Sequence, residues 1–170
     1  MEFLSAFPVA IIDEDYEGKS AAGIGMRQLG KAIEKEGLRV VAGVSYADAQ
    51  RLVEVFNNEA CWLVSVDGTE AGPKQWQILD DVLAKKRRRN DRLPIFLFGD
   101  QRTAEMVPAS VLKHANAFMQ LFEDSPEFLS RVIVRAANLY LERLPPPMFK
   151  AVRAPCCWWL DRPAGLTTSM

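Results

Sequence analysis

A regular alternation of short apolar runs and amphipathic segments most constrains what this chain can fold into. Five apolar runs of four to seven residues are typical of strands buried on both faces: Val9–Ile12, Arg39–Val44, Ala60–Val66, Ile95–Phe98 and Ala117–Phe122. The intervening segments carry apolar residues at three- and four-residue spacing, which predicts helices that begin near residues 20, 45, 73, 108 and 125. This alternation predicts an α/β domain with a parallel sheet covered on both faces.

Residues at the expected helix ends agree with this pattern. Ser20 and Ser45 are placed to cap the first two helices, and Gly37 supplies a left-handed stop after the first. Ser125, followed by Pro126 and an early acid, predicts a long last helix that ends near Arg143. Because crossovers between parallel strands are right-handed, we expect a flavodoxin-like, doubly wound sheet of strand order 2-1-3-4-5.

Composition and charge narrow the class of protein. The chain is 49% apolar and 25% charged, with a net charge of −1 that offers no overall field for nucleic acid or an anionic membrane. No apolar run reaches the roughly 18 residues of a membrane span, and the amino terminus lacks a signal-peptide pattern. Three cysteines without a Cys-x-x-Cys pair favour neither a disulfide framework nor a zinc site. We expect a cytoplasmic location.

Acidic residues follow the predicted strands at the edge where ligands bind in doubly wound sheets. Asp13 and Asp15 follow the first strand, and Asp67 follows the third. This arrangement resembles a response-regulator receiver, in which an acid pair holds magnesium and the later aspartate accepts a phosphoryl group. Receivers also carry a hydroxyl residue after strand four and a lysine after strand five, whereas this chain has Gly99 and the lysine-free stretch 120–123. Two interpretations follow: a vestigial metal site, or acids that end strands and cap turns.

Two further motifs have ordinary structural interpretations. Gly23, Gly25 and Gly30 approach a dinucleotide-binding fingerprint, but Gln28 replaces its third glycine and the motif lies inside a predicted helix. We expect these glycines to allow close packing or to mark a loose helix start. The basic run Lys85–Arg89 ends a predicted helix, where cations complement the helix dipole, and we expect a solvated helix end there and no nucleic-acid site.

Residues for catalysis are scarce. His114 is the single histidine, which argues against histidine-based metal clusters and against Ser-His or Cys-His catalysis. Cys61 lies in the middle of a predicted strand and is expected to be a small core residue. We therefore expect no catalytic, cofactor-binding or metal-binding residue in this chain.

The last predicted helix carries more apolar surface than one contact face requires. A wide stripe is formed by Leu129, Val132, Ile133, Ala136, Ala137, Tyr140, Leu141 and Leu144. Phe128, Val134 and Leu139 lie outside this stripe. We take Phe128, Val134, Leu139 and Tyr140 as candidates for an interface with another domain or subunit; a purely intramolecular core is the alternative.

Four segments resemble one enzyme family: Phe7–Asp15, Leu93–Gly99, Leu121–Phe128 and Leu144–Lys150. They resemble the amino-terminal domain of the bacterial biodegradative ornithine/lysine/arginine decarboxylases, nearest the arginine/lysine branch, over about residues 5–150. The resemblance implies a receiver-like domain, called the wing, that performs no chemistry and helps to build dimers and rings of dimers. Its expected partners are other copies or the remaining decarboxylase domains.

The resemblance ends at Ala151. The family continues toward a Trp-His-Thr-Pro-Gly-His motif, whereas residues 151–170 form an irregular sequence of the kind that a frameshift or truncation produces. The resemblance places pyridoxal phosphate, its lysine and the substrate pocket in later domains. We therefore expect residues 1–150 to be a non-catalytic assembly domain without a cofactor. The alternative is a stand-alone degenerate receiver that acts through protein–protein contacts.

Overall fold

A computed structural model of the chain describes residues 7–66 and 73–143. Its five parallel strands form one sheet in the order β2-β1-β3-β4-β5. The strands are β1 (Val9–Ile12), β2 (Val40–Val44), β3 (Cys61–Ser65), β4 (Ile95–Gly99) and β5 (Ala117–Gln120). The expected flavodoxin-like, doubly wound topology is therefore confirmed, including the order of the strands.

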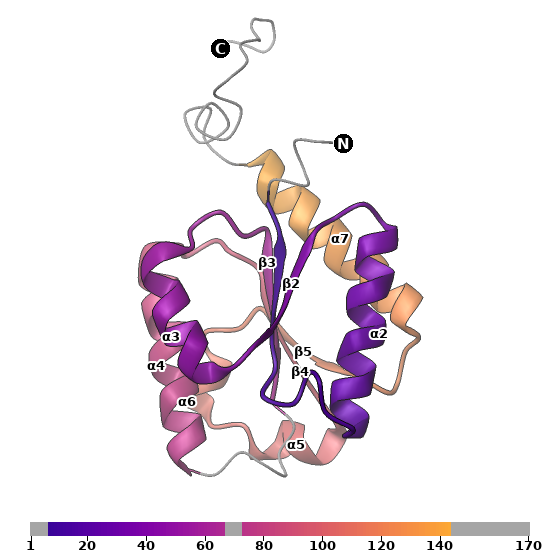
Figure 1. The fold of residues 1–170 in the computed structure, drawn as a ribbon. Coiled ribbons are helices and arrows are strands. Elements are labelled where there is room, and N and C mark those ends of the chain that lie inside the picture. The colour runs from indigo at the N-terminus through magenta and orange to yellow at the C-terminus, as the bar shows by residue number, and fades with distance from the viewer. Residues whose placement is uncertain (1–6, 67–72, 144–170) are drawn as a thin grey trace, which may run out of the picture.

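Helices cover both faces of this sheet. They are α2 (Ala21–Lys35), α3 (Tyr46–Val55), α4 (Pro73–Arg89), α5 (Gln101–Met106), α6 (Ala109–Leu112) and α7 (Pro126–Glu142). Figure 1 shows α2 and α7 together on one face, and α3, α4 and α6 on the other. Within the two described ranges, no helix is both long enough and apolar enough to cross a membrane.

Burial explains why the strands could be recognised. Every residue of β1, β3 and β4 is buried, so these strands are uninterrupted apolar runs. The edge strands β2 and β5 are only partly buried. Cys61 lies fully buried in β3, as expected for a core residue.

The expected helix caps are present. The hydroxyl oxygens of Ser20, Ser45 and Ser125 each accept the backbone N–H three residues later, at 3.0–3.1 Å. Gly37 follows α2 with a φ of +102°, the left-handed conformation that glycine adopts without steric cost. Several strand bounds differ from expectation by one or two residues; β5, for example, ends at Gln120. The short helix α5 is an additional element, capped by Asp100.

The basic run Lys85–Arg89 is not a fully solvated helix end, and the prediction for Lys86 was wrong. Lys86 is only 1% exposed, and its Nζ lies 2.6 Å from Oε2 of the equally buried Glu59. The same ammonium donates to the carbonyl of Phe56 at 3.1 Å, and the indole N–H of Trp62 donates to Glu59 Oε2 at 2.7 Å. Lys86 lies at helical spacing from the other buried residues of α4. Its position on the helix therefore directs it into the core although it is charged.

Arg87 is also drawn into the fold. Its guanidinium donates to the carbonyl oxygens of His114 and Leu93 and to Oδ1 of Asn116, at 2.7–2.8 Å. These bonds tie the end of α4 to the segments that lead into β4 and β5. Burial lowers the pKa of Arg87, and the nearby Asp91 partly opposes this shift.

The buried Lys86–Glu59 pair generates the first prediction. Replacing Lys86 by methionine leaves the Glu59 carboxylate buried without its cation, and should lower the free energy of unfolding by about 3–5 kcal/mol. Urea denaturation measures this change. The double variant Lys86→Met/Glu59→Gln should recover much of the loss, because no buried charge remains and the new amide oxygen can still accept from the Trp62 indole. Arg88→Met, which alters an exposed neighbour, should stay within about 0.5 kcal/mol; equal effects of Lys86→Met and Arg88→Met would contradict the prediction.

Candidate functional site

The first candidate site is the carboxyl edge of the sheet, where Asp13 and Asp15 follow β1. Asp13 is 5% exposed, and its Oδ1 accepts the backbone N–H of Asp15 at 3.0 Å. Oδ2 of Asp15 accepts the backbone N–H of Ser20 at 3.3 Å. Both carboxylates therefore stabilise the loop between β1 and α2. Asp67, the third acid of the possible vestigial site, lies outside the described residues.

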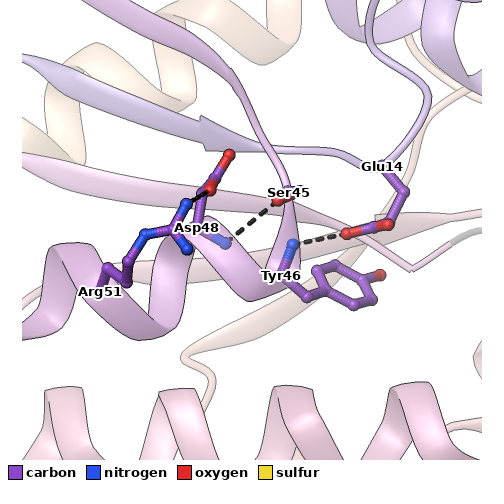
Figure 2. A network of polar contacts seen from close by, with 5 residues as sticks. All are labelled: Glu14, Ser45, Tyr46, Asp48 and Arg51. Atoms are coloured by element: carbon purple, nitrogen blue, oxygen red, sulfur yellow. Dashed lines mark hydrogen bonds and ion pairs between the residues drawn. The ribbon is translucent and has the colours of Figure 1, made fainter.

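Glu14, between these two aspartates, serves the neighbouring helix. Figure 2 shows its carboxylate accepting the backbone N–H of Tyr46 at the start of α3, beside the Ser45 cap. A carboxylate is favoured there because the first turn of a helix leaves N–H groups unpaired and carries a partial positive charge. Asp48 and Arg51 form an exposed ion pair in the same helix. The role of Glu14 was not recognised in the sequence, although the adjacent Ser45 cap marks the helix start that it contacts.

The hydroxyl of Tyr46 donates to the carbonyl of Ser65 at 2.6 Å. This bond links α3 to the last residue of β3, so the carboxyl edge is held together by contacts among its own groups. Within the described part of the chain, no three His, Cys, Asp or Glu residues gather closely enough to hold a metal ion. Asp13, Glu14 and Asp15 therefore act as caps of a loop and a helix.

Asp100, directly after β4, also caps a helix. Oδ1 of Asp100 accepts the backbone N–H of Thr103 at 2.7 Å and its hydroxyl at 2.8 Å. These hydrogen bonds lower the pKa of the Asp100 carboxyl. The arrangement starts α5 and explains why this short helix follows β4 directly.

The glycines that approach a dinucleotide fingerprint are explained by packing. A Cβ on Gly23 would lie 2.3 Å from the carbonyl oxygen of Asp15, and one on Gly25 would lie 2.8 Å from Leu121. A Cβ on Gly30 would lie 3.0 Å from the hydroxyl of Tyr16. The absence of side chains at these positions lets α2 approach the loop after β1 and the segment after β5, which confirms the packing interpretation.

A cleft of about 1120 Å³ lies at the opposite, amino edge of the sheet. It is formed by the end of α4, the start of β4 and the last turns of α7, and its lining includes Arg89, Arg92, Arg143, Phe96 and Leu139. We call it the basic cleft. Asp91 lies in the same lining, and Arg89 forms an exposed ion pair with Glu54 at 2.9 Å. Sequence reasoning missed this cleft because it is assembled from segments far apart in the chain.

Tyr140 lines the basic cleft and is 9% exposed. Its hydroxyl oxygen accepts a hydrogen bond from the side-chain amide of Asn90 at 2.5 Å. Burial raises the pKa of Tyr140; the negative charge of Glu59 adds to this rise, and the bond from Asn90 opposes it. Tyr140 is therefore a neutral, anchored part of the cleft wall.

The four interface candidates of α7 lie at different places. Phe128 is 47% exposed in the first turn, and Leu139 is 38% exposed where it lines the basic cleft. Val134 is half-buried against the core, and Tyr140 is buried beside Leu139. The structure therefore brings Leu139 and Tyr140 together and places Phe128 at the other end of the helix. Their binding to a partner stays a prediction.

Comparisons with known proteins agree with this fold. Residues 21–140 match the family described as the Orn/Lys/Arg decarboxylase, N-terminal domain. Lysine decarboxylase LdcA of Pseudomonas aeruginosa is 32% identical over 149 residues, which cover 86% of this chain and 20% of that protein. The biodegradative arginine decarboxylase of Escherichia coli K12 is 23% identical over 146 residues, 85% of this chain and 19% of that protein. This chain thus spans about one-fifth of the length of these curated relatives.

Among solved structures, this chain resembles both a decarboxylase and a receiver domain. Lysine decarboxylase A from Pseudomonas aeruginosa superposes with a TM-score of 0.72 and 30% identity, over 94% of this chain and 22% of that one. A response regulator receiver domain from Clostridium thermocellum superposes with a TM-score of 0.58 and 12% identity, over 81% of this chain and 99% of that one. The receiver likeness, at this identity, shows the fold alone.

The packing role of Gly23 can be tested by Gly23→Ala. The new Cβ would displace the Asp15 backbone, so we expect the free energy of unfolding to fall by about 1–3 kcal/mol. This is the net loss: it already includes the roughly 1 kcal/mol of stability that alanine gains over glycine inside a helix. Gln28→Ala, on the exposed face of α2, is the control for urea denaturation. Unchanged or increased stability of Gly23→Ala would mean that packing does not require this glycine.

Proposed function

The chain belongs to the Orn/Lys/Arg decarboxylase N-terminal domain family, and we propose that it is a non-catalytic assembly domain of a basic amino-acid decarboxylase. The observation that carries this proposal is the likeness to lysine decarboxylase LdcA, over 86% of this chain and only 20% of that protein. A domain that makes up so small a share of an enzyme contributes most simply through contacts with the remaining domains or with other copies. We propose that it comprises residues 1–150 and works in the cytoplasm.

The carboxyl edge supports a role without chemistry. Asp13, Glu14 and Asp15 accept backbone N–H groups, so their negative charges stabilise loops and the start of α3. The Cys61 thiol is fully buried, and burial raises its pKa, which keeps it protonated and a poor nucleophile. These contacts stabilise the domain and leave its outer surface for association.

The described residues do not fit pyridoxal phosphate, the cofactor of the parent family. A pyridoxal phosphate site needs a lysine amine that can form a Schiff base and a partner for the pyridine nitrogen. The ammonium of Lys86, the lysine buried in the described core, is held 2.6 Å from Glu59 and 3.1 Å from the Phe56 carbonyl. We therefore propose that the cofactor and the amino-acid substrate contact other domains of a decarboxylase.

A stand-alone degenerate receiver is the second candidate function. It rests on the positions of Asp13 and Asp15 after the first strand and of Asp67 after the third, which resemble the acids of a receiver. In this alternative the chain acts through protein–protein contacts, and Asp13, Asp15 and Asp67 form a vestigial metal site. The two proposals differ in what they expect of magnesium.

A magnesium titration separates the two proposals. Trp76 is the suitable reporter because it is half-buried in the first turns of α4, whereas Trp62 is buried in β3 beside Glu59. In a Trp158→Phe/Trp159→Phe background, we expect no saturable change in fluorescence with magnesium. A saturable change that Asp13→Asn abolishes would favour the degenerate receiver.

A domain exchange tests the assembly role directly. In a lysine decarboxylase similar to LdcA, deletion of the matching domain should lower the oligomer size seen by sedimentation velocity. Replacing that domain with residues 1–150 of this chain should restore the size. Failure of the exchange, with the exchanged protein folded by circular dichroism, would argue against an assembly role.

A further inference from the structure

The two ends of α7 carry surfaces of opposite character. At its start, Phe122 is 57% exposed and Phe128 is 47% exposed. Glu123, Asp124 and Glu127 lie beside them and are exposed, and within the described residues none of these three carboxylates forms an ion pair. We call these five residues the acidic knob: two exposed aromatic side chains and three exposed carboxylates that form no ion pair within the described residues.

The basic cleft lies at the other end of the same helix. Its apolar lining includes Leu139, which is 38% exposed, and the neighbouring Phe96. Arg92 and Arg143 are exposed at this lining and form no ion pair within the described part of the chain. Arg89 forms an exposed ion pair with Glu54, a type of contact that typically contributes less than about 1 kcal/mol. The lining holds three arginines and one acid, Asp91, so its excess of positive charge beside an apolar wall complements the acidic knob.

The separation of the two surfaces rules out their contact within one copy. The 17 residues of α7 span about 25 Å, and Figure 1 shows the helix running from the carboxyl edge to the amino edge of the sheet. The acidic knob of one molecule can therefore meet only the basic cleft of another molecule. A net charge of −1 leaves little overall repulsion between copies.

We propose that copies of this chain associate head to tail, with the acidic knob of one copy seated in the basic cleft of the next. This inference rests on the proposed assembly function and names the partner and the two surfaces. Such contact is heterologous, because different patches of the two copies meet. Successive copies then form a ring if the rotation between them closes, and an open chain if it does not.

Charge reversal tests this association in the complete 170-residue chain. Sedimentation velocity over a range of concentrations should show self-association at low salt that weakens near 1 M salt, where the screening length is about 3 Å. The knob variant is Glu123→Lys/Asp124→Lys/Glu127→Lys, and the cleft variant is Arg92→Glu/Arg143→Glu. Each alone should weaken association by on the order of tenfold or more, because like charges then face each other.

Combining the two reversals gives the decisive measurement. A chain that carries both sets of substitutions has a basic knob and an acidic cleft, so it should self-associate again. Lys31→Glu/Lys35→Glu, which changes two exposed lysines of α2, makes the same charge change as the cleft variant and should leave association intact. Urea denaturation of every variant shows whether the fold is kept, and Phe122→Ala provides a milder knob variant if a reversed one unfolds.

Three outcomes would overturn the head-to-tail contact. One is a chain that stays monomeric at all concentrations at low salt, and another is self-association that the reversals affect no more than the α2 control. The third is a monomeric chain whose basic cleft binds a decarboxylase that lacks its own amino-terminal domain, since the occupant is then another domain. None of these outcomes determines the result of the domain exchange described above. Failure of this inference can therefore be distinguished from failure of the proposed assembly function.

Discussion

Burial of the three central strands on both faces is the constraint on which the rest of the structure depends. Because β1, β3 and β4 present no polar face, helices must cover the sheet on both sides. Charged side chains then gather at the two edges where strands begin and end. The acids after β1 and the basic cleft before β4 are the two results of this arrangement.

The two edges use their charges differently. At the carboxyl edge, Asp13, Glu14 and Asp15 each accept a backbone N–H group, so these carboxylates stabilise a loop and the start of α3. At the amino edge, Lys86 and Glu59 form a buried pair while Arg92 and Arg143 remain exposed.

Local signals explain which parts of the fold could be predicted from the sequence. Apolar runs and the serine caps at Ser20, Ser45 and Ser125 act within a few residues, and the structure confirms them. Lys86 was misjudged because its charge was considered before its helical position, which continues a buried stripe. Glu14 and the basic cleft depend on contacts between segments distant in the chain, which no local pattern contains.

The pairing of α2 with α7 on one face of the sheet has a consequence for synthesis. These are the first and last helices of the described domain, so the face that they share joins residues from opposite ends of it. Contacts of such large sequence separation form late, since a long loop must close first. On the ribosome, the part of α2 that packs against α7 therefore stays uncovered until α7 has emerged, and a chaperone can protect it during that interval.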